Sequence, residues 1–171
     1  MTETTLPGKM AVGSDSVSNL TREITAHLEE KGIELIRCGS LAGEEADYVD
    51  AARDVAEAVS SGRCEQGLIF CNTGTGVTIV ANKVPGVRAA LCPDGFSARI
   101  AKLANNANVI VLGMRLTGEA HAREIVDTWL QTGPSTEERR VNFHRKTDEL
   151  DEEYRKQSPT TEQASSNERE E

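Results

Sequence analysis

The chain has 171 residues, with 19 Lys and Arg against 28 Asp and Glu and a net charge of −9. This length suits one domain with a single core, and the acidic balance argues against a nucleic-acid partner. No apolar run approaches the roughly 20 residues that span a bilayer, and the start of the chain lacks a secretory signal pattern. We therefore expect a cytoplasmic protein with no membrane partner. The four cysteines show no CxxC spacing and no clustering with histidine, which argues against a zinc site or a disulfide scaffold.

Short apolar runs alternate with longer segments of helical periodicity. The runs cover residues 9–13, 34–38, 67–71, 87–91 and 109–113. Between the first two, Leu20, Ile24 and Leu28 recur at the spacing of one helix face. Strands and helices in alternation predict βαβ units with right-handed crossovers. The sequence therefore predicts a three-layer α/β/α sandwich with a five-stranded parallel sheet.

The end of the chain differs in character. Phe143, Thr147, Leu150 and Tyr154 form a narrow stripe on an otherwise charged helix, which suits docking on a neighbouring surface. We expect one domain over residues 1–157 that includes this helix. Residues 158–171 contain no large apolar side chain, so we predict a disordered polar tail there.

Candidate functional residues follow the strands, because ligands of doubly wound sheets bind beyond the carboxyl ends of the strands. The segment "CNTGTG" at residues 71–76 begins like a dinucleotide fingerprint, but Ile79 stands where the third glycine belongs. A nucleotide-binding module is therefore the weaker alternative. Amides that enter a helix near Val77 suit an anion or a developing oxyanion, although the glycines would also serve a simple tight turn.

Cys71 and Asp15 each allow two interpretations. Cys71 is either a small core residue or a thiolate base beside the amide-rich loop. Asp15 either caps the helix that follows or handles substrate hydroxyl protons. His27, His121 and His144 fall on predicted helices, and we expect all three on the surface, away from the strand ends.

Several motifs resemble the B-type ribose-5-phosphate isomerase and galactose-6-phosphate isomerase family. They include "GSD" after the first strand, "CNTGTGVTIVANKVPGVRAAL", "FSAR" and "NNANVIVLGMRLTG", and the resemblance runs from residue 9 to residue 129. It implies a Rossmann-like fold and the interconversion of aldose and ketose phosphates without metal or cofactor. It also implies a homodimer or tetramer whose active site is shared between subunits.

The resemblance also implies roles for particular residues. Cys71 would be the base that moves a proton between C1 and C2, Thr73 would stabilise the enediolate, and Asp15 would act on substrate hydroxyls. The remaining positions of the implied substrate site are Ser16, Tyr48, Asn72, Gly74, Thr75, Gly76, Asn105 and Arg140, the last of which would bind phosphate.

The chain departs from the family pattern at several of these positions. Ser16 stands where a phosphate-binding histidine is usual, and Ala104 where a histidine is thought to open the sugar ring. Thr136 replaces one phosphate-binding arginine. Asn72 and Thr75 stand where glycine and a β-branched aliphatic residue are usual. Arg115, Arg139 and Lys83 are candidates to replace the lost basic groups, and sequence spacing does not choose among them.

A base without a ring-opening group indicates a substrate that has no ring to open. The chain also resembles, more closely, the branch that converts D-erythrulose 4-phosphate to D-erythrose 4-phosphate in tetritol catabolism. This reaction is the favoured hypothesis. Ribose-5-phosphate isomerase and a noncatalytic subunit of an isomerase complex are the alternatives.

Overall fold

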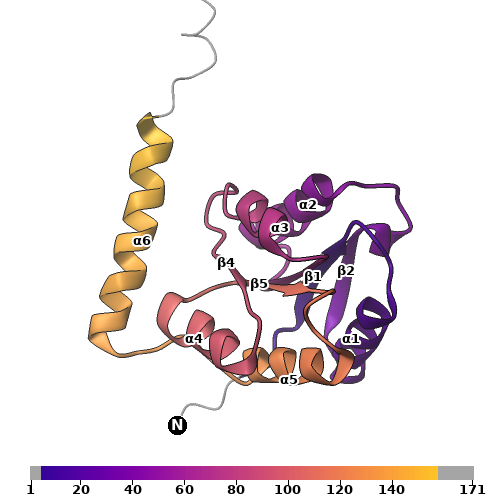
Figure 1. The fold of residues 1–171 in the computed structure, drawn as a ribbon. Coiled ribbons are helices and arrows are strands. Elements are labelled where there is room, and N and C mark those ends of the chain that lie inside the picture. The colour runs from indigo at the N-terminus through magenta and orange to yellow at the C-terminus, as the bar shows by residue number, and fades with distance from the viewer. Residues whose placement is uncertain (1–4, 158–171) are drawn as a thin grey trace, which may run out of the picture.

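The computed structural model describes residues 5–157, so the tail predicted at residues 158–171 lies outside the described part. Strands and helices alternate along the chain, followed by one long C-terminal helix (Figure 1). The strands are β1 (Lys9–Ser14), β2 (Glu34–Gly39), β3 (Gln66–Cys71), β4 (Ala89–Leu91) and β5 (Val109–Gly113). The helices are α1 (Asn19–Glu30), α2 (Tyr48–Ser60), α3 (Thr75–Ala81), α4 (Gly95–Asn105), α5 (Glu119–Leu130) and α6 (Glu138–Gln157), with a short 3-10 turn η1 (Ser40–Ala42) after β2.

All five strands are parallel and lie in the order β2-β1-β3-β5-β4. Helices α2 and α3 cover one face of the sheet, and α1, α4 and α5 cover the other (Figure 1). The predicted α/β/α sandwich is therefore confirmed. Strand β2 lies on one side of β1 and β3 on the other, so the direction in which the chain adds strands to the sheet reverses between β1 and β3. In doubly wound sheets, ligands bind at the carboxyl ends of the strands beside such a reversal.

Strand β4 is shorter than predicted. The N–H of Val87 donates to the Val84 carbonyl in a turn, and the N–H of Arg88 donates to the side chain of Asn108 at 2.7 Å. Regular pairing with β5 therefore begins only at Ala89.

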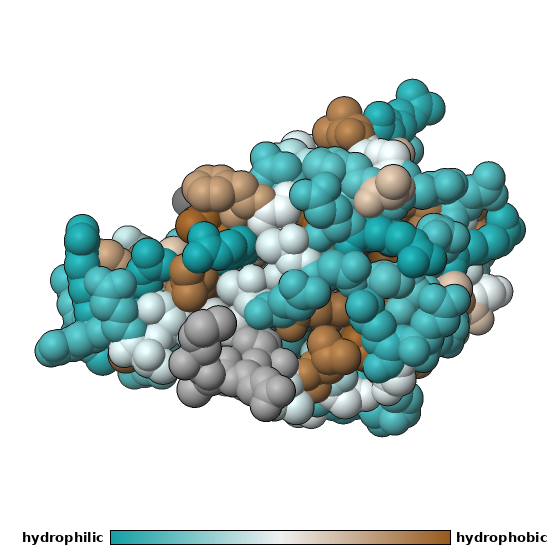
Figure 2. Space-filling view, turned by 90° about the horizontal axis from the view of Figure 1, so that it is seen from below, coloured by the Kyte–Doolittle hydropathy of each residue, from teal (hydrophilic) through white to brown (hydrophobic). Residues whose placement is uncertain are grey.

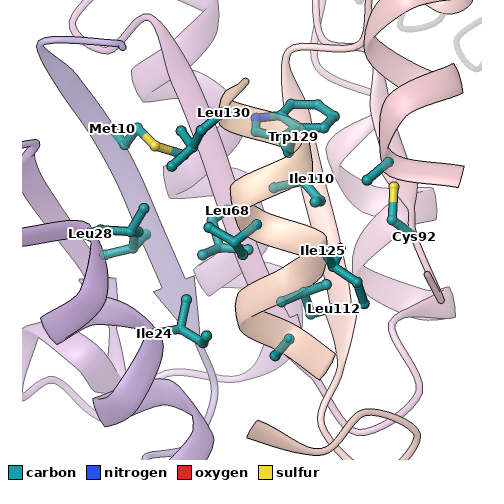
Figure 3. Close-up of a cluster of buried hydrophobic side chains, with 14 of the residues drawn as sticks. Met10, Ile24, Leu28, Leu68, Cys92, Ile110, Leu112, Ile125, Trp129 and Leu130 are labelled. Atoms are coloured by element: carbon teal, nitrogen blue, oxygen red, sulfur yellow. The ribbon is translucent and has the colours of Figure 1, made fainter. Parts of the chain in front are cut away.

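The larger core cluster lies between the sheet, α1 and α5 (Figure 3). The predicted stripe of α1 is buried there, with Ile24 and Leu28 against the strands. Trp129 of α5 is fully buried, and its Nε1 donates to Oε1 of Gln66 at 2.6 Å. The ammonium of Lys102 lies 4.6 Å from the centre of the Trp129 ring. A lysine thus covers the outer side of an otherwise apolar core.

Glycines on the central strands set the position of α2. A Cβ on Gly13 would lie 2.5 Å from Cγ2 of Val55, and a Cβ on Gly67 would lie 2.8 Å from Cγ1 of the same residue. Any larger residue at these positions would push α2 away from the sheet. The start of α2 at Tyr48 is set by its N-cap Asp47, whose carboxylate accepts hydrogen bonds from two backbone N–H groups of the first turn.

Helix α6 stands beside the sandwich and extends beyond it (Figure 1). Nε2 of His144 donates to the Ala104 carbonyl at 2.8 Å, and Arg88 pairs with Asp148 at 2.8 Å. The side of the molecule seen in Figure 2 is mainly hydrophilic, with hydrophobic areas separated from one another over the described residues. By contrast, the stripe predicted on α6 is exposed in this chain, with Leu150 53% accessible. None of the helices within residues 5–157 is long and apolar enough to cross a bilayer.

The histidine predictions are wrong in three respects. His27 and His144 are buried rather than on the surface. His27 faces α5, where its Nε2 donates to Asp127 at 2.7 Å and its Nδ1 accepts from Arg123 at 3.1 Å. His121 is exposed as predicted, but it hydrogen-bonds the Pro93 carbonyl in the loop after β4 and so lies near a strand end. Each of these contacts depends on a polar partner from another part of the chain, on a helix for His27 and His144 and in a loop for His121, which the sequence does not reveal.

The buried lysine predicts a pH-dependent stability. Burial lowers the pKa of Lys102 from 10.5 to about 8. Below about pH 8 both the folded and the unfolded states hold the proton, whereas between about pH 8 and 10.5 the unfolded state binds it more tightly. The free energy of unfolding should therefore rise with pH in this window, by about 3 kcal/mol in total.

Urea unfolding followed by circular dichroism between pH 7 and 11 measures this rise. Lys102→Met is the matched control, because it keeps the length of the side chain and removes the titrating group. Identical pH profiles for the two proteins would contradict the prediction.

Candidate active site

Most of the predicted site residues meet at the carboxyl edge of the sheet. Gly13 of β1 is level with Ile69 of β3. Asp15, just after β1, and Cys71, the last residue of β3, each follow this pair by two residues. Neighbouring strands are about 4.8 Å apart. Ser16 follows Asp15 directly, and the Cys71 loop continues through Asn72, Thr73, Gly74, Thr75 and Gly76. The thiol and the carboxylate thus come from the ends of adjacent strands at one edge of the sheet.

Tyr48 joins this group from α2. A Cβ on Gly76 would lie 3.1 Å from a ring carbon of Tyr48, so the ring packs directly on the loop. The two glycines of the loop are required for different reasons. Gly74 has a φ of +84°, which favours glycine, whereas Gly76 is helical and leaves room for Tyr48. A tight turn accounts for Gly74 but not for Gly76.

The loop leads into α3 two residues earlier than the predicted start near Val77. Thr78 is the first residue of α3 whose N–H bonds back to the turn, to the Gly74 carbonyl at 3.2 Å. The N–H groups of Thr75, Gly76 and Val77 precede it and have no acceptor within the helix. These donors lie next to Cys71, where negative charge could be accommodated.

Cys71 differs from the other cysteines in its burial. It is half-buried at the end of β3, whereas Cys38, Cys64 and Cys92 are buried, and all four are free. Burial raises the pKa of Cys38 to about 11 and that of Cys92 to about 12, and it also raises the pKa of Cys64. These three thiols therefore belong to the core, and Cys71 is the accessible one.

Asp15 does not cap the helix that follows it. Ser18 is the N-cap of α1, and it forms a reciprocal capping box with Thr21. Asp15 instead accepts a hydrogen bond from Oγ of Ser16 at 3.3 Å. Of the two interpretations of Asp15, the helix cap is excluded. After β4, by contrast, the aspartate does cap the helix that follows: Asp94 accepts a hydrogen bond from the N–H of Ser97 in α4 at 2.7 Å.

Asn105 and Arg140 lie away from Cys71 within one chain. Helix α4 runs back from the carboxyl edge, so Asn105, its last residue, lies near the start of β5. Cys71 pairs with Gly113 at the other end of β5, roughly 13 Å of strand away from Val109. Asn105 and Arg140 instead line a groove of about 1020 Å³ between α6 and the sandwich.

Arg140 carries an unmet hydrogen-bonding group in this groove. Its Nε lies 3.2 Å from Oε2 of Glu137. Its Nη1 is buried and has no hydrogen-bond partner among the described residues. A buried guanidinium nitrogen without a partner is costly, so an acceptor from outside this chain is expected there.

Of the three candidate basic residues, one lies at the carboxyl edge in the same chain as Cys71. The N–H of Arg115 donates to the Asn72 carbonyl at 3.0 Å, and the exposed Arg115 side chain has no ion pair with any described residue. Lys83 follows α3 at the opposite edge. Arg139 lies on α6, 5.5 Å from the ring of Phe143. Sequence spacing did not choose among these three basic residues. The backbone hydrogen bond from Arg115 to Asn72 shows that Arg115 is the one that adjoins the loop.

Metal binding finds no support in the described residues. Within residues 5–157 no group of three or more His, Cys, Asp or Glu side chains is arranged to hold an ion.

Comparison with known proteins identifies the family. The family model described as ribose/galactose isomerase matches residues 10–146. The chain belongs to this family. The predicted family and the predicted class of enzyme, an aldose–ketose isomerase of sugar phosphates, are thereby confirmed.

Three relatives illustrate the similarity. The chain is 42% identical to ribose-5-phosphate isomerase B of Escherichia coli (strain K12) over 123 aligned residues, which make up 71% of this chain and 83% of that protein. It is also 42% identical to D-erythrulose-4-phosphate isomerase of Pectobacterium atrosepticum over 123 aligned residues, which make up 71% of this chain and 81% of that protein. The solved structure of ribose-5-phosphate isomerase B from Clostridium thermocellum matches with a TM-score of 0.79 and 42% identity, and covers 85% of this chain and 99% of that chain. Equal identity to two isomerases of different sugars does not choose the substrate.

The burial of the cysteines predicts selective alkylation. Iodoacetamide should modify Cys71 about tenfold or more faster than Cys38, Cys64 and Cys92, since those thiols are covered and hold their protons more tightly. Peptide mass spectrometry over a time course gives the four rates, and unfolding in urea should make them similar. Equal rates in the native protein would contradict this assignment.

Proposed function

We propose that the protein isomerises a four-carbon sugar phosphate, D-erythrulose 4-phosphate to D-erythrose 4-phosphate, with Cys71 as the base. The observation that carries the proposal is the combination of an accessible cysteine at position 71 with an alanine at position 104. The accessible thiol of Cys71 adjoins a loop of free donors, while Ala104 occupies the position where the family usually has its ring-opening histidine. The proton-transfer chemistry is retained without the group that prepares a cyclic sugar.

The reaction needs a base and a place for negative charge. The Cys71 thiolate takes a proton from C1 of the ketose, and the electrons of the C–H bond form the enediolate, whose charge resides on O2. Thr73 and the loop amides donate to that oxygen. Asp15 moves the hydroxyl proton from O1 to O2, and Cys71 returns its proton to C2, which leaves the aldehyde at C1. No atom or electron pair is gained or lost overall.

The absent histidine indicates the length of the sugar. An aldopentose 5-phosphate closes into a furanose through its C4 hydroxyl, so its isomerase must first open the ring. In a tetrose 4-phosphate the C4 oxygen is esterified, so no furanose forms and the substrate arrives as an open chain. The methyl side chain of Ala104 cannot transfer a proton to a ring oxygen.

The histidine nearest to Ala104 does not supply the missing group. Nε2 of His144 is bonded to the carbonyl of Ala104 itself, and the residue is 9% accessible. This imidazole therefore fastens α6 to α4. Its Nε2 is thereby committed to this contact and does not donate a proton to a substrate.

The proposed site needs two copies of the chain. Asn105 and Arg140 lie at the far end of β5 from Cys71, so they can meet the substrate only at the Cys71 loop of a partner subunit. The exposed stripe on α6, with Phe143 and Leu150 about half accessible, supports such an association. Arg115 from the thiol-bearing subunit and Arg140 from its partner would together hold the phosphate, and an acceptor oxygen would satisfy Nη1 of Arg140.

A substrate comparison tests the proposal. Wild type and Cys71→Ala are assayed in the aldose-to-ketose direction with D-erythrose 4-phosphate and D-ribose 5-phosphate under identical conditions. We expect kcat/KM of the wild type for the tetrose to exceed that for the pentose about a hundredfold or more, and Cys71→Ala to lose about 10³-fold or more on the preferred sugar. The second loss exceeds an ordinary binding defect because the base itself is removed.

Each part can fail separately. Greater turnover of D-ribose 5-phosphate would replace the proposed four-carbon substrate by the pentose phosphate, and full activity of Cys71→Ala would overturn the mechanism. If the pure protein turned over no tetrose, pentose or hexose phosphate, it would instead be a noncatalytic subunit.

Complementation tests the shared site. Cys71→Ala and Arg140→Ala should each be nearly inactive alone, yet refolding them together should recover about a quarter of wild-type activity, because half of the dimers are mixed and each mixed dimer has one intact site. Co-refolding of Cys71→Ala with Thr73→Ala is the matched control and should recover nothing, since both changes disable the same loop. Absence of recovery in the first mixture would contradict a site built from two chains.

A further inference from the structure

The two threonines of the Cys71 loop are hydrogen-bonded to each other through their side chains. Oγ1 of Thr73 lies 3.0 Å from Oγ1 of Thr75, and both residues are exposed in this chain. Thr75 is the first residue of α3, and its hydroxyl has no other hydrogen-bond partner among the described residues. The pair thus joins a proposed donor to the rigid start of a helix.

From this contact we infer that Thr75 is a positioning residue that orients the Thr73 hydroxyl toward the substrate. The inference rests on the proposed function and adds a residue to it. It also gives Thr75 a different task from direct substrate binding, since Thr75 acts through Thr73.

The direction of the hydrogen bond follows from the chemistry of the partners. A hydroxyl has one proton and two lone pairs, and it can rotate to suit its surroundings. The enediolate oxygen has only lone pairs, so the Thr73 hydroxyl must donate its one hydrogen bond to that oxygen. Thr73 Oγ1 then accepts, and Thr75 is the donor that fills this role. The chain of donors runs from Thr75 to Thr73 to the substrate, and each bond polarises the next.

Without the Thr75 hydroxyl, the Thr73 hydroxyl has no hydrogen-bond partner among the described residues. It can then turn its proton to water, and part of its orientation has to be established anew during each reaction cycle. The cost falls on the charged enediolate more than on the neutral carbonyl of the substrate, because hydrogen bonds to charged groups are the stronger ones. The loss should therefore appear mainly in kcat.

Conservative variants isolate the hydroxyl. Thr75→Val keeps the β-branched shape and removes the donor, and Thr75→Ser keeps the donor and removes a methyl group. Thr78→Val is the matched control on the same helix, since the Thr78 hydroxyl bonds the Gly74 carbonyl at 2.7 Å and does not contact Thr73. Each is compared with the wild type, with Thr73→Val and with the double variant Thr73→Val/Thr75→Val.

We expect Thr75→Val to lower kcat about threefold to tenfold, the effect of one neutral hydrogen bond, with KM changed less than about twofold. Thr75→Ser and Thr78→Val should stay within about twofold of the wild type. The double variant should be no slower than Thr73→Val, because Thr75 has nothing to orient once the Thr73 hydroxyl is gone. A hydroxamate analogue of the enediolate should bind Thr75→Val more weakly by the same factor as the loss in kcat.

The inference is overturned if Thr75→Val keeps full kcat, if Thr75→Ser fails to restore it, if Thr78→Val loses as much, or if the two losses multiply in the double variant. These results concern Thr75 alone, provided that the wild type is active and Cys71→Ala is not. A wild type without activity on any sugar phosphate would overturn both the inference and the proposed function.

Discussion

Parallel pairing of β1 with β3 is the constraint on which the rest of the site depends. Because both strands point the same way, the chain after each of them emerges at one edge of the sheet, and Asp15 and Cys71 lie at these adjacent strand ends. The reversal of strand order between them keeps any crossover helix from covering this point. A carboxylate and a thiol that are far apart in the sequence therefore come to the same edge of the sheet.

Close packing of α2 completes this half of the site. Gly13 and Gly67 let the helix approach the sheet, and the helix then delivers Tyr48 onto the Cys71 loop at the place where Gly76 has no side chain. Two sheet glycines and one loop glycine thus cooperate to position a single aromatic ring. The other half of the proposed site lies on α4 and α6, and α6 extends from the sandwich with its apolar stripe exposed. A chain of this shape is suited to a partner that covers the groove.

Sequence periodicity predicted most of the fold, and it failed where side chains replace backbone pairing. The strand predicted at residues 87–91 is cut short because the Asn108 side chain takes the N–H of Arg88. The surface assignment of His27 and His144 failed for a related reason. Each imidazole is buried by partners far away in the sequence, Asp127 and the Ala104 carbonyl. Histidine is intermediate in its average burial, and the residue type alone carries no information about such partners.

The sequence by itself determined the sandwich, the thiol loop after the third strand and the family resemblance, because alternating periodicity and contiguous motifs are local properties of the chain. Only the tertiary structure excluded Asp15 as a helix cap, placed Arg115 beside the loop, and separated Asn105 and Arg140 from Cys71. These are questions of distance between segments, and distance depends on strand order, helix packing and the direction in which α4 runs. The bond between Thr73 and Thr75 belongs to the same class, since it requires the αL turn at Gly74 to bring the two hydroxyls together.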